Sequence, residues 1–410
     1  MKIGLFGFGC VGQGLYDILN KMGHFQAEIV KICVKHANKE RSLPAHYFTY
    51  DPQELLNDEE IDIIVELIDN ADEAFEIVAT ALKKGKNVVT ANKKMLAEHL
   101  SELVVLQKEY GSTLLYEGSA CGSIPIIRTL EEYYDNELLF SVDGIFNGSS
   151  NYILTKVIQE GLPYSEALKQ AQELGFAESD PTLDVGGFDP KYKLCILALH
   201  AYGIQVKPEE VFNFGIAQLN EADIQFAKEK GYKLKLVANS FKVDEQSIAL
   251  FVVPQLINAD HDLYHIENEF NAVIVQAAFS QRQTLVGKGA GGHPTGSAVL
   301  SDISALTYNY QYEYKKLHRE RAQKATATTQ VGLEVYLRYN KEEDLALLDF
   351  DDISERYIGK GSGYVIGTIQ LSKLLAAQET ITQKELFLAF TGKTTAEKEA
   401  VEVSQESLMA

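Results

Sequence analysis

Cysteine is scarce in this chain, whose 410 residues include only Cys10, Cys33, Cys121 and Cys195. The four lie far apart in sequence and form no Cys-x-x-Cys pair, so the pattern predicts neither a zinc site nor a disulfide framework. We expect free thiols, most of them buried as small hydrophobic side chains.

Positive charge is also in short supply, because 38 Lys and Arg residues face 58 Asp and Glu residues, for a formal net charge of -20. This charge repels the phosphate backbone of nucleic acid, and no basic stripe with interleaved aromatic residues offsets it. Apolar runs of the roughly 18 residues that a membrane helix needs are missing as well. The start, MKIGLFGFG, has no targeting pattern. We expect a cytoplasmic protein with no nucleic-acid or membrane partner.

The chain is longer than the roughly 250 to 300 residues that one core supports, so we expect two or three domains. In the first third, short apolar runs from KIGLF to STLLYE alternate with helical patterns. This alternation predicts an α/β fold with a doubly wound parallel sheet. We assign residues 1–135 to a dinucleotide-binding domain of this kind, completed by a helix at about 294–311.

The pattern changes from about Phe140, where LLFSVDGIF, KLKLVANSF and SIALFVVPQL read as strands of a sheet covered on one face. They predict a second, α+β domain over residues 136–293. The charged stretch EYKKLHRERAQK reads as a solvated helix end or linker. Residues 325–410 suggest a small C-terminal α/β unit, in which we expect ITQKELFLAFTG to be helical.

A GxGxxG motif, formed by Gly7, Gly9 and Gly12, follows the first predicted strand and opens a helix. The first glycine permits a tight turn, the second lets the backbone approach a pyrophosphate, and the third lets the helix pack closely on the strand. The helix start then offers unpaired N–H groups to the phosphates. A plain glycine-rich turn is the alternative. The predicted cofactor-binding turn includes Cys10 and Val11.

The end of the second strand, ICVKHANKER, bears on the choice of cofactor. An acidic residue there would bind the ribose hydroxyls of NAD, whereas basic residues accept the 2′-phosphate of NADP. The segment carries Lys35, with Lys39 or Arg41 nearby and no acid at the tip, which favours NADP. Ordinary surface charges are the alternative, and NAD stays possible.

Lys93 lies where the strand NVVT gives way to a helix, and Thr90, the last residue of that strand, is a further cofactor-binding candidate. Asn92 is a natural N-cap and places Lys93 and Lys94 in the first turn, where a positive charge opposes the helix dipole at a cost of about 0.3 to 1 kcal/mol. Such a broken local rule at the carboxyl end of a parallel strand indicates function. A surface lysine pair is the alternative.

The densest polar stretch is GFAESDPTLDVGGFDPKYKL, which carries Glu178, Asp184, Asp189 and Lys193. Asp-Pro and Gly-Gly indicate a loop over its first part. Lys193 follows Asp189 by one helical turn on the same face. The apolar residues after Lys193 indicate a buried helix, so we expect this lysine to open onto a cleft, and a surface ion pair is the alternative.

A second glycine-rich stretch, GKGAGGHPTGS, fails the test for a phosphate loop of the P-loop type because Gly289 follows Lys288 where Ser or Thr is needed. Pro294 suits a helix start. We expect a backbone-rich loop able to lie against a ligand, with Gly289 and Gly291 as further cofactor-binding candidates.

Taken in order, GFGCVGQG, TANKK, EGSACGSIPIIRTL, GIFNGSSNYIL, ELGFAESDPTLDVGGFDPKYKL and GAGGHPTGSAVLSD make the chain resemble the homoserine dehydrogenase family over about its first 310 residues. The resemblance implies reversible NAD(P)-dependent oxidation of L-homoserine to L-aspartate 4-semialdehyde, a step toward threonine, methionine and isoleucine. It also implies that the second domain serves dimerisation, and that the protein is a homodimer or homotetramer.

The resemblance also implies roles for particular residues. Lys193 and Lys93 match the catalytic lysine and a second lysine at the reacting oxygen, where a proton must leave as hydride departs. The positions that match substrate-binding residues are Glu178, Asp184, Asp189, Gly148 and Ser149. Those that match a backbone-carbonyl site for a sodium ion are Glu117, Ala120, Gly122 and Ile124.

The match is not complete. Phe176 stands where the family often has Tyr, and SACGS replaces a more glycine-rich run. The C-terminal unit lacks the usual Pro-Gly turn of an ACT regulatory module, which makes it at most a degenerate ACT-like unit. A related dehydrogenase of another amino-acid alcohol or semialdehyde and a catalytically inactive NADP-binding sensor are the competing functions. Intact Lys93 and Lys193 argue against the sensor.

Overall fold

The structure is a computed structural model that describes the whole chain except residues 23–24, 38, 136–137, 178, 321–323 and 397–410. The chain forms two compact units. The first consists of residues 1–132 and 288–314, and the second of residues 133–287 and 315–410.

The first unit is built on a parallel sheet with the strand order β3-β2-β1-β4-β5-β6. Its strands are β1 (Lys2–Phe6), β2 (Glu28–Cys33), β3 (Phe48–Thr49), β4 (Ile63–Glu66), β5 (Asn87–Thr90) and β6 (Leu114–Leu115). The strand order reverses between β1 and β4, and the crevice beyond the carboxyl ends of such a pair is where doubly wound sheets bind ligands.

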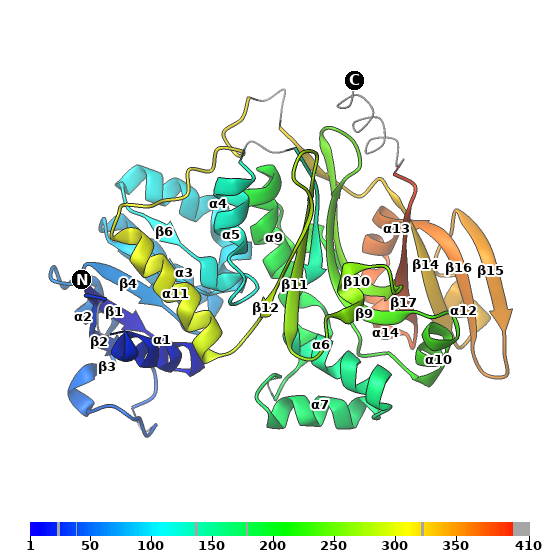
Figure 1. The fold of residues 1–410 in the computed structure, drawn as a ribbon, viewed down its shortest axis with the longest axis horizontal. Helices are drawn as coiled ribbons and strands as arrows, with labels where there is room; N and C mark the ends of the chain where they lie inside the picture. Colours follow the sequence, from blue (N-terminus) through cyan, green and yellow to red (C-terminus); the bar gives the residue numbers. More distant parts are fainter. Residues whose placement is uncertain (23–24, 38, 136–137, 178, 321–323, 397–410) are drawn as a thin grey trace. The chain divides into compact units, whose positions relative to one another are not determined.

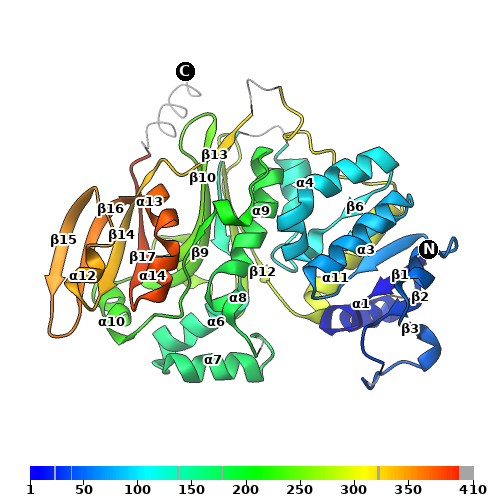
Figure 2. The ribbon, with the colours of Figure 1, turned by 180° about the vertical axis from the view of Figure 1, so that it is seen from behind.

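Helices cover both faces of this sheet. They are α1 (Cys10–Lys21), α2 (Pro52–Leu56), α3 (Ala71–Lys83), α4 (Lys93–Tyr110), α5 (Ile126–Arg128) and α11 (Gly292–Leu306). Figure 1 shows α1 and α11 together on one face, and Figure 2 shows α3 and α4 on the other.

Helices α1 and α11 meet backbone to backbone. A Cβ atom on Gly14 would lie 2.2 Å from the carbonyl oxygen of Gly292, and one on Gly296 would lie 2.8 Å from the amide nitrogen of Leu15. Only glycine permits such an approach. The helix expected at about 294–311 is therefore α11, and it packs into the first unit.

The second unit contains a mixed sheet with the order β12-β11-β7-β9-β10-β17-β14-β16-β15, and β8 and β13 also pair with β10. Its strands are β7 (Leu139–Ile145), β8 (Phe212–Asn213), β9 (Lys233–Lys242), β10 (Ser247–Ile257), β11 (Phe270–Ala277), β12 (Gln281–Lys288), β13 (Thr326–Thr328), β14 (Gly332–Tyr339), β15 (Asp352–Ile358), β16 (Gly363–Gln370) and β17 (Phe387–Thr394).

The helices of this unit are α6 (Gly148–Thr155), α7 (Tyr164–Glu173), α8 (Thr182–Val185), α9 (Phe188–Tyr202), α10 (Glu221–Glu229), α12 (Glu342–Leu345), α13 (Leu371–Ala376) and α14 (Gln378–Gln383). Helix α9 contacts β7, β9 and β10. Every residue of α9 after Phe188 is buried. This explains why the helix is apolar nearly all round rather than along one stripe.

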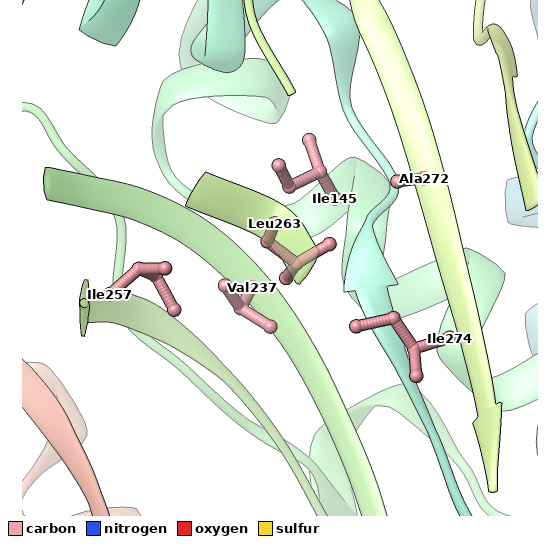
Figure 3. Packing of buried hydrophobic residues seen from close by; sticks show 6 residues of the cluster. All are labelled: Ile145, Val237, Ile257, Leu263, Ala272 and Ile274. Carbon is pink, nitrogen blue, oxygen red and sulfur yellow. The ribbon is translucent and has the colours of Figure 1, made fainter. Parts of the chain in front are cut away.

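A hydrophobic cluster fills part of the second unit between its strands and the short turn Asp262–His265 (Figure 3). The cluster consists of Ile145, Val237, Ile257, Leu263, Ala272 and Ile274, each exposed by 1% or less. Side chains from β7, β9, β10 and β11 thus share one apolar layer, which holds the strand that leads into α6.

Several sequence-based expectations of secondary structure were wrong. The helix expected over ITQKELFLAFTG ends at Gln383, and the apolar part of that segment forms β17. A short apolar run does not distinguish a buried strand from a helix, and pairing with β14 and β10 decides for the strand. The edge strands β12 and β15 were missed because both are mostly exposed and polar.

The charged stretch expected to be a solvated helix end or linker also differs from expectation. The charged stretch that begins at Glu313 is not simply solvated, since Lys316 is buried and its Nζ donates to the carbonyl of His200 at 2.8 Å. Residues 325–410 lie in the same compact unit as residues 133–287, because β17 pairs with β10. The division into three domains stays a prediction.

The α/β fold class is confirmed by the helix-covered parallel sheet and the second, mixed unit. None of the four cysteines, all of them described, forms a disulfide. Across the described residues, no helix has both the length and the apolar character that crossing a membrane requires.

Candidate active site

The glycine motif forms the turn between β1 and α1, and its three glycines differ in their surroundings. Gly7 has φ +91°, and a Cβ there would lie 2.5 Å from the carbonyl oxygen of Leu67. A Cβ on Gly12 would lie 2.6 Å from the carbonyl oxygen of Gly7, whereas one on Gly9 would meet nothing within 4 Å. The first and third glycines are therefore needed for packing, and the second leaves space for a phosphate to approach the backbone.

Helix α1 begins at Cys10, and Gly9 supplies no side-chain cap. The N–H groups of the first turn have no partner within a helix, which makes such a terminus an anion site. The second glycine-rich loop lies beside it, because a Cβ on Gly292 would be 2.5 Å from the carbonyl oxygen of Cys10. Gly291, with φ +115°, turns the chain into α11. The structure thus brings both predicted cofactor loops together.

The basic residues after β2 have partners within the first unit. The Nζ of Lys35 lies 2.6 Å from Oε1 of Glu73, and both side chains are exposed. Arg41 donates to the carbonyls of Lys39 and His36 and lies over the ring of Phe48 at 5.0 Å. Exposed ion pairs contribute only about 0 to 1 kcal/mol, so a 2′-phosphate could displace Glu73 from Lys35.

The turn from β5 to α4 has the geometry expected from the sequence. The side chain of Asn92 caps α4 by accepting a hydrogen bond from the amide of Met95 at 3.0 Å, and Lys93 is the first helical residue. Lys93 is half-buried, whereas Lys94 is exposed. Thr90 is fully buried, and its hydroxyl donates to the carboxylate of Glu66, so neither its side chain nor its backbone is exposed.

The sequence analysis missed Glu66, the last residue of β4. Its side chain is fully buried, and its carboxylate accepts hydrogen bonds from the Thr90 hydroxyl at 2.5 Å and the Ile68 amide at 2.7 Å. Burial raises the pKa of Glu66 to about 7, against the opposing effect of these two hydrogen bonds. The signal was present in the sequence as an acid ending the otherwise apolar strand IIVE.

The segment that matches the sodium loop is held by a buried cluster of charges. The carboxylate of Glu117 accepts from the amides of Ile127 and Arg128, and the amide of Glu117 donates to Asp302 at 2.7 Å. Burial raises the pKa of Glu117, and burial together with the neighbouring Glu117 raises that of Asp302 to about 8. Arg128 lies 3.0 Å from Asp302 and partly offsets both effects.

Backbone geometry in the same loop is unusual. Cys121 and Gly122 are consecutive residues with φ +53° and +57°, and a Cβ on Gly122 would lie 2.5 Å from the carbonyl oxygen of Lys288. Because each carbonyl oxygen has two lone pairs, the loop fits a hard cation that takes oxygen ligands.

In the second unit, Asn147 joins the predicted substrate residues. Its amide donates to Asp184 at 2.7 Å and to Asp189 at 2.9 Å. The Nζ of Lys193 lies 2.7 Å from Asp189 and donates to the carbonyl of Phe146 at 2.6 Å. Asp189 and Lys193 are exposed by only 3% and 6%, so the alternative of a surface ion pair is wrong.

Asn147 also begins α6, because its side chain accepts from the amide of Ser150 at 2.7 Å. A Cβ on Gly148 would lie 2.6 Å from the carbonyl oxygen of Glu269, so the position requires glycine. The hydroxyl of Ser149 donates to the carbonyl of Phe176. Asn147 was not singled out from the sequence, although an Asn directly before Gly-Ser-Ser is an N-cap signal.

The predicted site residues therefore gather in two groups. Asp184, Asp189 and Lys193 meet through Asn147 in the second unit, while Lys93 belongs to the first unit with the glycine loops. Glu178 lies outside the described residues. A doubly wound sheet with this turn, in a chain that also buries a lysine against carboxylates, defines a nicotinamide-dependent oxidoreductase.

Comparison with known proteins identifies the family. Residues 7–117 match the family model "Homoserine dehydrogenase, NAD binding domain", and residues 125–304 match the model "Homoserine dehydrogenase". The homoserine dehydrogenase of Bacillus subtilis is 39% identical over 318 residues, which are 75% of this chain and 73% of that protein. The chain belongs to the homoserine dehydrogenase family, and the resemblance inferred from the motifs is confirmed.

Solved structures also match the homoserine dehydrogenase family. A homoserine dehydrogenase from Thiobacillus denitrificans is 31% identical with a TM-score of 0.78, over 96% of this chain and 97% of that one. A hyperthermophilic archaeal homoserine dehydrogenase in complex with NADPH is 27% identical with a TM-score of 0.64, over 76% of this chain and 98% of that one. The chain is thus an oxidoreductase with a nicotinamide cofactor and a small-molecule substrate.

Proposed function

We propose that this chain catalyses the reversible oxidation of L-homoserine to L-aspartate 4-semialdehyde, with NADP preferred over NAD. The observation that carries the proposal is the group of Asp184, Asp189 and Lys193 around Asn147, in which Asp184 is half-buried and the other three residues are buried. Carboxylates such as those of Asp184 and Asp189 complement the ammonium of an amino-acid substrate.

Lys193 is suited to the proton transfer. Two of the hydrogen-bonding positions on its Nζ are directed at Asp189 and at the carbonyl of Phe146 in the described part of the chain, which leaves the third for a substrate hydroxyl. In the oxidation the neutral amine takes the proton of the C4 alcohol through its lone pair and becomes the ammonium, and in the reverse direction the ammonium returns that proton. When bound, the nicotinamide accepts or supplies the hydride.

The remaining roles follow the family match. Lys93 acts as the second lysine at the reacting oxygen, and Gly148 and Ser149 close over the substrate. Glu117, Ala120, Gly122 and Ile124 offer backbone carbonyls to a sodium ion, and such oxygen atoms are the ligands that a hard cation takes. Lys35 and Arg41 receive the 2′-phosphate.

We further propose a homodimer or homotetramer located in the cytoplasm. The mostly exposed edge strand β12 supports the assembly, because its backbone can pair with a second chain. Sedimentation of the purified protein at the mass of one chain would contradict it.

The function is tested by following reduced cofactor with homoserine and each nucleotide. Homoserine-dependent reduction is expected with NADP and more weakly with NAD, and no turnover with either would refute the proposal. Lys193→Ala should abolish turnover while NADPH binding persists. The matched control is Lys191→Ala, which removes another buried lysine of α9 that lies over the ring of Phe188. It should retain turnover even if stability falls.

A further inference from the structure

Glu66 occupies a notable place in the first unit. It ends β4, which neighbours β1 at the point where the strand order reverses, and it is opposite Thr90 in the pairing of β4 with β5. Its fully buried carboxyl group faces donors on both oxygens. A buried acid is costly compared with an apolar or amide side chain, which indicates that the acid has a function here.

The hydrogen bonds around Glu66 form a closed ring. The carboxylate accepts from Ile68 and Thr90, and the Thr90 hydroxyl accepts from the amide of Asn92 at 3.0 Å. The side-chain amide of Asn92 in turn donates to the carbonyl of Ile68 at 3.0 Å. Asn92, which caps α4, belongs to this ring and directly precedes Lys93 in the sequence.

The two turns joined by the ring depend on Glu66 to different degrees. The turn after β4 has an independent support, because the amide of Leu67 donates to the carbonyl of Phe6 at 2.8 Å. In the turn after β5, the Thr90 hydroxyl oxygen accepts a hydrogen bond from the amide of Asn92, and the hydroxyl donates its own hydrogen bond to the carboxylate of Glu66. Loss of the carboxylate should therefore disturb the turn after β5, which leads to Lys93, more than the turn after β4, against which Gly7 packs.

We infer that Glu66 is a positioning residue for the reaction: its carboxylate holds the β5–α4 turn and thereby sets the place of Lys93. The inference rests on the proposed function, in which Lys93 acts at the reacting oxygen. The ionised carboxylate accepts from both neighbours at once. Glutamine can keep the bond from Ile68 only by donating its amide to the Thr90 hydroxyl, which already accepts from Asn92, so the Thr90 proton loses the acceptor it has in the wild type.

The test is a double-mutant cycle on the full-length enzyme with Glu66→Gln, Lys93→Ala and the combination. Glu66→Gln should lower kcat by about tenfold or more, because a displaced Lys93 stabilises the transition state less well. The dissociation constant for NADPH, measured by fluorescence, should change by less than about threefold because the turn after β4, against which Gly7 packs, has its own support. In the Lys93→Ala background, Glu66→Gln should have little further effect on kcat.

The control is Gln107→Leu, at the other end of α4, where the Gln107 side chain bonds to Tyr314 and the amide of Leu114. It should lower the melting temperature and leave kcat unchanged. If Glu66→Gln does not fold, Thr90→Val and Thr90→Ser replace it, and the serine variant, which keeps the hydroxyl, should show the higher kcat.

The outcomes separate the two proposals. Wild-type enzyme without homoserine turnover would refute the proposed function. Normal wild-type turnover together with an unchanged kcat in Glu66→Gln, or with equal losses in the wild-type and Lys93→Ala backgrounds, would refute the role of Glu66 alone. Equal kcat for Thr90→Val and Thr90→Ser would also count against it.

Discussion

The buried pair of Lys193 and Asp189 allows a quantitative prediction. Replacing Lys193 by Met keeps much of the side-chain volume but leaves Asp189, exposed by only 3%, with Asn147 as its remaining side-chain donor in the contacts described above. Breaking a buried pair by removing one partner costs about 3 to 5 kcal/mol, since the other charge stays buried after its cation is lost. We expect a loss of that size in the free energy of unfolding.

The double variant Lys193→Met with Asp189→Asn removes the stranded charge. The amide can still accept from Asn147, so we expect the double variant to regain at least half of the lost stability. Urea unfolding of the wild type, both single variants and the double variant gives the coupling energy. A loss below about 1 kcal/mol for Lys193→Met would refute the reasoning, because that value is typical of a solvated ion pair.

Three other predictions concern the first unit. Lys35→Asp should shift the ratio of kcat/KM for NADP over NAD by at least about tenfold toward NAD, and Lys94→Asp serves as a surface control; an unchanged ratio would remove Lys35 from the cofactor site. Gly9→Ala should fold normally and weaken NADPH binding, because its Cβ has space in the protein. Gly7→Ala should lower the melting temperature, because its Cβ would strike Leu67. The reverse pattern would contradict the roles given to these glycines. Burial raises the pKa of Glu66 from 4.5 to about 7. Between these pH values the folded state keeps a proton that the unfolded state releases, so the free energy of unfolding falls as pH rises, by up to ~3 kcal/mol from this residue. Unfolding measured across that range should show a flatter pH dependence in Glu66→Gln, and parallel curves would show that Glu66 has an ordinary pKa.

Features that depend on neighbours in the sequence were predicted well. The GxGxxG turn, the Asn92 cap and the one-turn spacing of Asp189 and Lys193 all arise from the few residues around them. The alternation of apolar runs and helical patterns was sufficient to predict the parallel sheet, because a parallel strand buried on both faces is a nearly continuous apolar run.

Features that depend on distant partners were not predicted. Residues of the FLAF segment form a strand that pairs with β14 and β10, and the buried Lys316 donates a hydrogen bond to the carbonyl of His200, 116 residues away in the sequence. Periodicity cannot report such partners, since the same apolar run suits a helix or a strand until a neighbour is present.

The sequence by itself determined the family and the nicotinamide cofactor, and it singled out the lysines and carboxylates proposed for the site, because these are carried by motifs of adjacent residues. Only the tertiary structure decided how those groups are connected. Asn147 bridges Asp184 and Asp189 across 37 and 42 residues, and Glu66 reaches Thr90 across 24. A hydrogen bond needs atoms within about 3 Å, and that closeness comes from the packing of strands and helices rather than from spacing along the chain.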